Sequence, residues 1–176
     1  MSLLGALMAQ RVWKEDKNGV RKPGLRRIHF DMVFDQYKSQ DSRQVLGALQ
    51  ELFQHINAKH PEVKKIHLVS DNASCFASHD CIPFMYFLNK RFKENGKDIR
   101  VERWLYTEAC TGKDDEDAHF SYLNTIFAEY VLDGQDMVTE QQVFKALQFQ
   151  DGVAGSYALL MDGKDLAREK KHVYVV

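Results

Sequence analysis

Ile66-His67-Leu68-Val69-Ser70-Asp71 is the stretch that decides the fold of this chain. Ile66 to Val69 predicts a short buried strand, and Asn72-Ala73-Ser74 turns the chain directly after the carboxylate of Asp71. An acid at a strand tip can cap that turn, or it can bind a divalent cation, since hard cations prefer oxygen ligands. The segments on either side decide which of these roles is open to Asp71.

Two strands and a helix are expected before this stretch. Leu4 to Trp13 is strand-like, Asn18-Gly19 is a strong tight-turn signal, and Ile28 to Phe34 alternates as a half-buried strand after a break at Pro23-Gly24. The two strands predict an antiparallel pair. A helix capped by Ser39 or Asp41 then follows, with apolar residues at helical spacing: Val45, Leu46, Leu49, Leu52, Phe53 and Ile56.

Helices and strands also alternate after Asp71. A helix is expected over about residues 82–93, ended by Asn95-Gly96, with Phe84, Phe87, Leu88 and Phe92 facing inward. Ile99 to Tyr106 predicts a strand. A third helix starts near Asp114 and ends at Asp133-Gly134, and Thr139 to Gln142 resembles a capping box that opens a short fourth helix. In the tail, Tyr157 to Met161 and His172 to Val176 are apolar enough for strands.

This order predicts an α/β fold, a mixed sheet with flanking helices. Right-handed crossovers make the Ile66 and Ile99 strands parallel neighbours, with helices packed on the sheet. Ligand sites of such sheets lie beyond the carboxyl ends of the parallel strands, where Asp71 is expected. Residues 1–150 are assigned to the domain, and residues 151–176 to a tail of uncertain structure.

A second acid, Asp117, follows 46 positions after Asp71, in the first turn of the third helix. It shares a helical face with Phe120, Ser121 and Asn124, so it faces the sheet if Phe120 does. Asp114 and Asp115 are expected to face solvent. Asp71 and Asp117 are therefore candidate ligands of a shared Mg²⁺ or Mn²⁺. The alternative is structural, because acids commonly cap turns and begin helices.

Composition limits the class of protein. The chain has 176 residues, 44% hydrophobic and 11% aromatic, which suits one domain with a sizeable core and argues against disorder. No apolar run approaches the roughly 18 residues of a membrane span, so no membrane association is expected. Three cysteines without a CxxC pattern indicate neither a disulfide framework nor a zinc finger, and favour a reducing, intracellular compartment.

The net charge of −1 conceals two basic zones, which are either solvated surface or a nucleic-acid track. One comprises Lys14, Lys17, Arg21, Lys22, Arg26 and Arg27, and the other Lys90, Arg91, Lys93, Lys97, Arg100 and Arg103. Two weaker candidates for functional residues remain. His119 is either a partner of the metal site or a histidine at the core edge. Cys75 and Cys110 either approach each other near the site or are small buried residues without a function. Ser70 lacks the G-x-S-x-G context of a hydrolase.

The motifs Val69-Ser70-Asp71-Asn72-Ala73, Thr107-Glu108-Ala109, Gly112-Lys113 and Asp117-Ala118-His119-Phe120 together carry a resemblance. In this order they resemble the ribonuclease H-like (DDE-type) domain of eukaryotic transposon-derived proteins, over roughly residues 4–147. The resemblance implies that Asp71 and Asp117 are the second and third catalytic acids and metal ligands. It also implies DNA as the partner and the nucleus as the location.

The chain departs from the pattern of these domains at its start. The first acid of such domains lies on a central first strand, which would precede Leu4, and neither Asp31 nor Asp35 is a convincing substitute. We therefore expect a piece of a longer protein, truncated at its N-terminus, that binds Mg²⁺ or Mn²⁺ weakly or not at all and is inactive alone.

Two functions stay open. One is a metal-dependent polynucleotidyl transferase or nuclease, in which water or a DNA 3′-hydroxyl attacks a phosphodiester. The other is a non-catalytic domain that binds protein or nucleic acid. A missing central strand would also leave unpaired edges, which the segment His172 to Val176 or a strand from a second copy could fill, the latter giving a homodimer.

Overall fold

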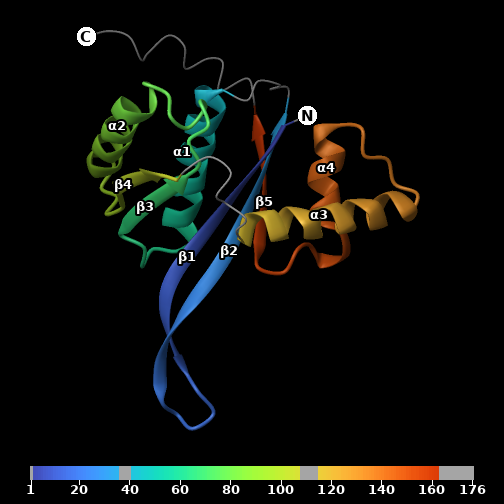
Figure 1. The fold of residues 1–176 in the computed structure, drawn as a ribbon, viewed down its shortest axis with the longest axis horizontal. Coiled ribbons are helices and arrows are strands. Elements are labelled where there is room, and N and C mark those ends of the chain that lie inside the picture. Colours follow the sequence, from blue (N-terminus) through green and yellow to red (C-terminus); the bar gives the residue numbers. More distant parts are fainter. Residues whose placement is uncertain (1, 36–40, 108–114, 163–176) are drawn as a thin grey trace. The chain divides into compact units, whose positions relative to one another are not determined.

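The computed structural model describes residues 2–35, 41–107 and 115–162. The chain divides into two compact units. Unit 1 consists of residues 1–36 and 113–161, and unit 2 of residues 37–112 and 162–176. Strands and helices occur in both units, so the expected α/β class is confirmed (Figure 1). The assignment of residues 1–150 to one ribonuclease H-like domain stays a prediction.

A long antiparallel hairpin of β1 (Ser2–Glu15) and β2 (Arg21–Asp35) begins unit 1, as the sequence predicted. Its turn lies at Asn18-Gly19, where Gly19 has a φ of +76°, a conformation that glycine adopts without strain. Oδ1 of Asp16 accepts hydrogen bonds from the backbone N–H groups of Asn18 and Val20. The end of the hairpin is therefore closed by a specific set of contacts.

Two details of this hairpin were predicted wrongly. The expected break at Pro23-Gly24 is absent, because β2 runs through both residues. Ile28 to Phe34 is not half-buried either. Five consecutive residues, Phe30 to Phe34, are buried, so both faces of this part of β2 are covered.

The sheet of unit 1 has the order β1-β2-β5. β5 (Ser156–Asp162) is the strand predicted at Tyr157 to Met161, and Figure 1 shows it running in the same direction as β2, which makes the sheet mixed. Phe30 of β2 and Tyr157 of β5 stack with ring centroids 5.5 Å apart. The sheet thus holds together a hairpin and a strand that lie more than a hundred residues apart in sequence.

Two helices complete unit 1: α3 (Asp115–Leu132) and α4 (Glu140–Ala146), followed by the short 3-10 helix η1 (Phe149–Asp151). The capping box at α4 is confirmed, with reciprocal bonds between Thr139 and Gln142. Helix residues and strand residues share one apolar cluster, whose buried members are Val33, Leu123, Val143, Leu147 and Val153. This cluster packs α3 and α4 on the sheet.

Unit 2 contains α1 (Ser42–Lys59), β3 (Lys65–Ser70), α2 (Cys81–Glu94) and β4 (Arg100–Tyr106). Asp41, one of the two predicted caps, accepts hydrogen bonds from the first backbone N–H groups of α1. The strands β3 and β4 pair in parallel, as predicted, and form a separate two-stranded sheet. Phe53 of α1 and Phe92 of α2 meet edge to face at 6.4 Å.

The side-chain amide of Asn89 joins α2 to β4. It donates to the carbonyl of Val101 and accepts from its N–H, both at 2.9 Å, and so satisfies the backbone along an edge strand. Two burial predictions fail in this unit. Phe87, predicted to face inward, is 49% exposed, and the strand β3 is not buried, since Val69 is 64% exposed.

Several predictions fall outside the described residues. They concern the alternative cap Ser39, the motif residues Glu108, Ala109, Gly112 and Lys113, Cys110, Asp114, and the tail segment His172 to Val176. Among the described strands, β1 and β3 are each paired on one side only, because the two sheets have the orders β1-β2-β5 and β3-β4.

Candidate functional site

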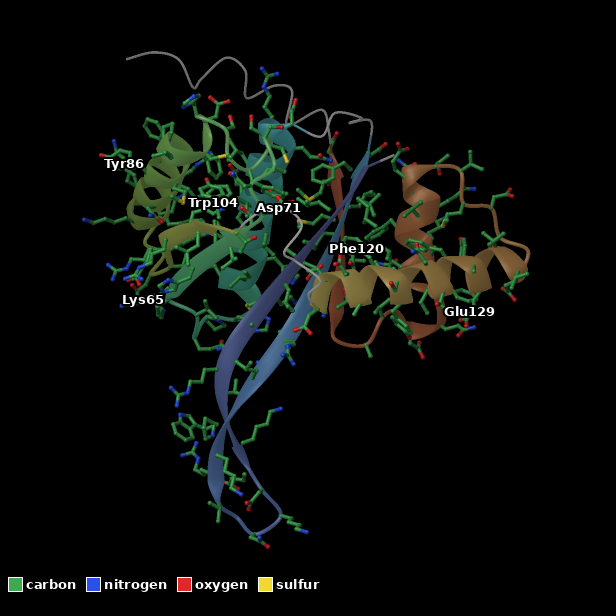
Figure 2. The ribbon with its side chains drawn as sticks, viewed as in Figure 1. Lys65, Asp71, Tyr86, Trp104, Phe120 and Glu129 are labelled. Carbon is green, nitrogen blue, oxygen red and sulfur yellow. The ribbon has the colours of Figure 1, made fainter. Side chains whose placement is uncertain are left out.

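Asp71 lies immediately after the last residue of β3 and is exposed. Its Oδ1 accepts a hydrogen bond from the N–H of Ala73 at 3.1 Å, the turn-capping role that the sequence left open. The end of the strand is held by its neighbour in β4, since Trp104 Nε1 donates to Ser70 Oγ at 2.9 Å (Figure 2). Asp71 therefore presents a carboxylate at a fixed strand end of unit 2.

Asp117 lies in the first turn of α3, in unit 1, and is exposed. Its neighbour Glu116 contacts the sheet, since Glu116 Oε1 lies 3.1 Å from Nδ1 of His29 in β2. Phe120 does pack on the sheet, against Gly5 of β1, whereas Asp117 is exposed, so the expectation that Asp117 faces the sheet stays a prediction. Asp115 is half exposed and pairs with Arg27 at 2.7 Å.

A buried cluster of histidines and carboxylates lies beside this turn. Asp31 is 1% exposed, and its two oxygens lie 2.8 and 3.1 Å from Nε2 of His119. Ser156 Oγ donates to the same carboxylate. The rings of His119 and His29 stack, with centroids 4.0 Å apart and planes inclined by 12°. A continuous set of polar contacts therefore runs from β5 through β2 to the start of α3.

This cluster fixes the backbone that carries Asp117. Glu116 precedes Asp117 by one residue and His119 follows it by two, and both are held by β2, through His29 and Asp31 respectively. Burial raises the pKa of Glu116, while the charge and hydrogen bond of His29 oppose that rise. The approach is close because β1 has no side chain at Gly5, where a Cβ would lie 2.6 Å from Glu116 Oε2.

Sequence reasoning missed most of this cluster. Asp31 was considered only as a substitute for the first acid and set aside, and His29 was not singled out, although an acid in the middle of an apolar strand is itself a signal of a buried partner. His119 was considered as a partner of the metal site or as a histidine at the core edge. Its described contacts, with Asp31 and with the ring of His29, are those of a core-edge histidine.

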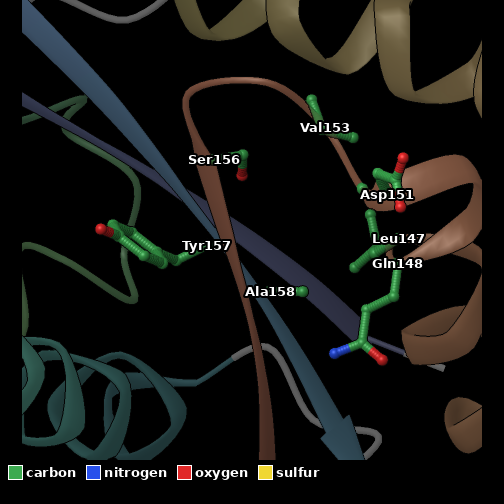
Figure 3. A pocket seen from close by; sticks show the side chains of 8 residues that line it. Leu147, Gln148, Asp151, Val153, Ser156, Tyr157 and Ala158 are labelled. Atoms are coloured by element: carbon green, nitrogen blue, oxygen red, sulfur yellow. The ribbon is translucent and has the colours of Figure 1, made fainter.

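A shallow depression of unit 1 opens beside β5, between the end of α4 and the residues that follow η1 (Figure 3). It includes Ser156, the donor to Asp31, and Asp151. Gln150 and Asp151 have positive φ angles of 50° and 71°, which non-glycine residues adopt with strain. No charged side chain other than Asp151 lines it, so the described residues offer little to hold a charged ligand.

Other chemistries find little support in the described part of the chain. Burial raises the pKa of the free thiols of Cys75 and Cys81, which disfavours the reactive thiolate. No set of three or more metal-ligating side chains converges among the described residues. None of the helices in residues 2–35, 41–107 and 115–162 has the length and apolar character needed to cross a membrane.

Comparison with protein-family models, with curated proteins and with solved structures found no match for this chain. Asp71 and Asp117 belong to different units, so their convergence around a metal stays a prediction.

Proposed function

We propose that this chain is part of a ribonuclease H-like, metal-dependent polynucleotidyl transferase or nuclease, in which Asp71 and Asp117 are catalytic carboxylates. One observation carries the proposal: each acid is exposed at the end of an element whose position is fixed by other contacts. Asp71 follows a strand with a parallel neighbour, and Asp117 lies in the helix turn clamped by Asp31 and His29. Preorganised carboxylates of this kind suit a metal site.

The arrangement of strands supports the same proposal. In a ribonuclease H-like sheet the first strand is central, and its two neighbours correspond here to β1 and β3. These two are edge strands in the described residues. Each of them therefore has an edge of unpaired N–H and C=O groups along which a further strand could pair. The two acids of this chain would then be two of three ligands, so binding of Mg²⁺ or Mn²⁺ should be weak.

Each residue has a defined part in the proposal. Asp71 and Asp117 would hold Mg²⁺ or Mn²⁺ by their carboxylate oxygens, and the metal would supply the positive charge that stabilises a phosphodiester under attack. Asp31, His119, His29 and Glu116 are positioning residues, because their contacts hold the turn that carries Asp117. Their replacement should disturb the site through the geometry of α3.

Paramagnetic broadening by Mn²⁺ tests the shared site without relying on activity. We expect substoichiometric Mn²⁺ to broaden the amide NMR signals next to both Asp71 and Asp117. Either substitution, Asp71→Asn or Asp117→Asn, should reduce the broadening at both positions. Asp115→Asn is the matched control, since it removes an exposed acid of the same helix turn. Broadening near Asp117 that survives Asp71→Asn would refute a shared site, and sub-micromolar affinity would refute the two-ligand description.

A non-catalytic binding domain is the second candidate. The hydrogen bond from the Ala73 N–H to Asp71 favours it, because that contact gives the acid a structural role without a metal. In that case Asp71→Asn should lower the stability of unit 2, while Mn²⁺ should broaden neither site. The same NMR titration, with thermal melts of the variants, therefore separates the two candidates.

A further inference from the structure

The outer part of the β1–β2 hairpin, residues 11–27, is a strongly basic two-stranded ribbon, called here the ribbon arm. Its 17 residues contain seven basic and two acidic side chains, a net charge of +5 in a chain whose total is −1. All seven basic residues are exposed. Figure 1 shows this part of the hairpin continuing beyond β5 and the helices of unit 1. The charge is thus concentrated on one projecting element.

Part of this positive charge is neutralised by ion pairs within the protein. Lys22 pairs with Asp16 at 2.8 Å, and Arg27 pairs with Asp115. Among the described residues, Lys14, Lys17 and Arg21 make no ion pair. Lys14 also lies directly across the strands from Lys22, and like charges in that position destabilise a hairpin. A polyanion bound along the ribbon arm would remove this repulsion.

Apolar side chains on the ribbon arm are exposed as well. Trp13 is 58% exposed and Leu25 is 55% exposed, and the register places Trp13 opposite Pro23 and Arg11 opposite Leu25. The guanidinium of Arg11 lies over the Trp13 ring, 5.4 Å from its centroid. Exposed aromatic and guanidinium groups beside lysines are typical of surfaces that contact nucleic acids.

The shape of the ribbon arm selects the form of nucleic acid. Two antiparallel strands fit the major groove of B-form DNA, which is about 12 Å wide, whereas the major groove of A-form RNA is too narrow. Strand residues 11–15 span roughly 17 Å at about 3.4 Å per residue, so basic side chains could reach several phosphates. The turn is closed by Asp16, which keeps the ribbon ordered at its end.

We propose that the ribbon arm is a duplex-DNA-binding element that lies in the major groove, with Lys14, Lys17 and Arg21 on the phosphates. The contacts are to the backbone, so binding does not depend on sequence. The evidence lies wholly in β1 and β2, so this inference does not rest on the metal site formed by Asp71 and Asp117. Binding should therefore persist in EDTA, which removes any divalent metal.

Fluorescence anisotropy of a labelled 20-base-pair duplex, in EDTA, tests the proposal. If about four phosphates are neutralised, the association constant should fall about 10²-fold between roughly 50 and 200 mM salt. The triple variant Lys14→Glu, Lys17→Glu, Arg21→Glu should lose at least about tenfold in affinity. The matched control, Lys64→Glu, Lys90→Glu, Lys93→Glu, makes the same change in net charge on exposed residues of unit 2 and should bind like the unchanged chain. Equal losses in the two variants would overturn the proposal.

Trp13 gives a second measurement that does not depend on how the charge variants fold. The chain has two tryptophans, so Trp104→Phe leaves Trp13 as the single reporter. Duplex DNA should quench this fluorescence, and Trp13→Phe should show no comparable change. An unchanged Trp13 signal at saturating DNA would overturn the proposal. Tighter binding to duplex RNA, to an acidic polypeptide or to anionic lipid vesicles than to duplex DNA would also overturn it.

Discussion

Replacement of Asp31 by alanine should remove the centre of the polar cluster in unit 1. The carboxylate is 1% exposed and accepts hydrogen bonds from His119 and Ser156. Without it, the buried His119 and the partly buried Ser156 lose their acceptor at once. Breaking a buried ionic or hydrogen-bonded pair from one side costs about 3–5 kcal/mol, so we expect Asp31→Ala to lower the free energy of unfolding by that amount.

Further variants separate the contribution of the Asp31–His119 interaction from that of the side-chain volume that alanine removes. Asp31→Asn keeps the shape and one acceptor oxygen, so its loss should be smaller, about 1–2 kcal/mol. The double variant Asp31→Leu with His119→Phe replaces both partners by apolar groups. Such replacements are often tolerated, so the double variant should lose less than the two single substitutions added together, by about 1–3 kcal/mol.

Urea denaturation followed by far-UV circular dichroism measures these differences. In a Trp13→Phe background the fluorescence of Trp104, in unit 2, provides a second probe, and coincident transitions would justify treatment as a single two-state process. A loss below about 1 kcal/mol for Asp31→Ala would refute the reasoning. Strict additivity of Asp31→Leu and His119→Phe would show that the two side chains are not coupled.

Three other substitutions test the remaining contacts. Gly5→Ala should cost about 1–3 kcal/mol, because its Cβ would lie 2.6 Å from Glu116 Oε2, whereas Gly24→Ala meets only a flexible lysine at 3.3 Å and should cost little in the same urea assay. Burial raises the pKa of Glu116 in the folded state above its ordinary 4.5, so the folded protein favours the protonated carboxyl. The stability that protonated Glu116 contributes is therefore complete below about pH 4.5 and is lost as pH rises through the folded-state pKa. Glu116→Gln should therefore gain stability relative to the unchanged chain from about pH 4.5 upward, and a constant difference would contradict this. Asn89→Ala should cost about 1–3 kcal/mol by leaving the backbone of Val101 without partners, and amide exchange at Val101 should accelerate.

Short sequence patterns predicted the strands and helices of this chain correctly. The Asn18-Gly19 turn, the Asp41 cap and the capping box at Thr139 each involve residues within four positions of one another, so the sequence contains all the information they need. The parallel pairing of β3 and β4 also followed, from the handedness of crossovers. The positions of Asp71 and Asp117, at a strand end and in a first helix turn, were likewise readable from local pattern.

Burial was less predictable than the elements themselves. Phe87 has the periodicity of an inward residue but is 49% exposed, and Val69 is 64% exposed in a strand that looks buried. Periodicity shows which residues share a face of an element, but the other elements of the fold decide whether that face is covered. In β2 the reverse holds, because both faces are covered and the alternating pattern understated its burial.

The sequence alone determined the order of strands and helices, the turn of the hairpin, and the concentration of positive charge in residues 11–27, because each depends on neighbours along the chain. Only the tertiary structure decided that this charge lies on a ribbon rather than a loop, and that Glu116 contacts the sheet. The pair of Asp31 and His119 joins residues 88 positions apart. Contacts of that range depend on how helices pack on sheets, and a one-residue rotation of α3 would have placed a different acid against β2.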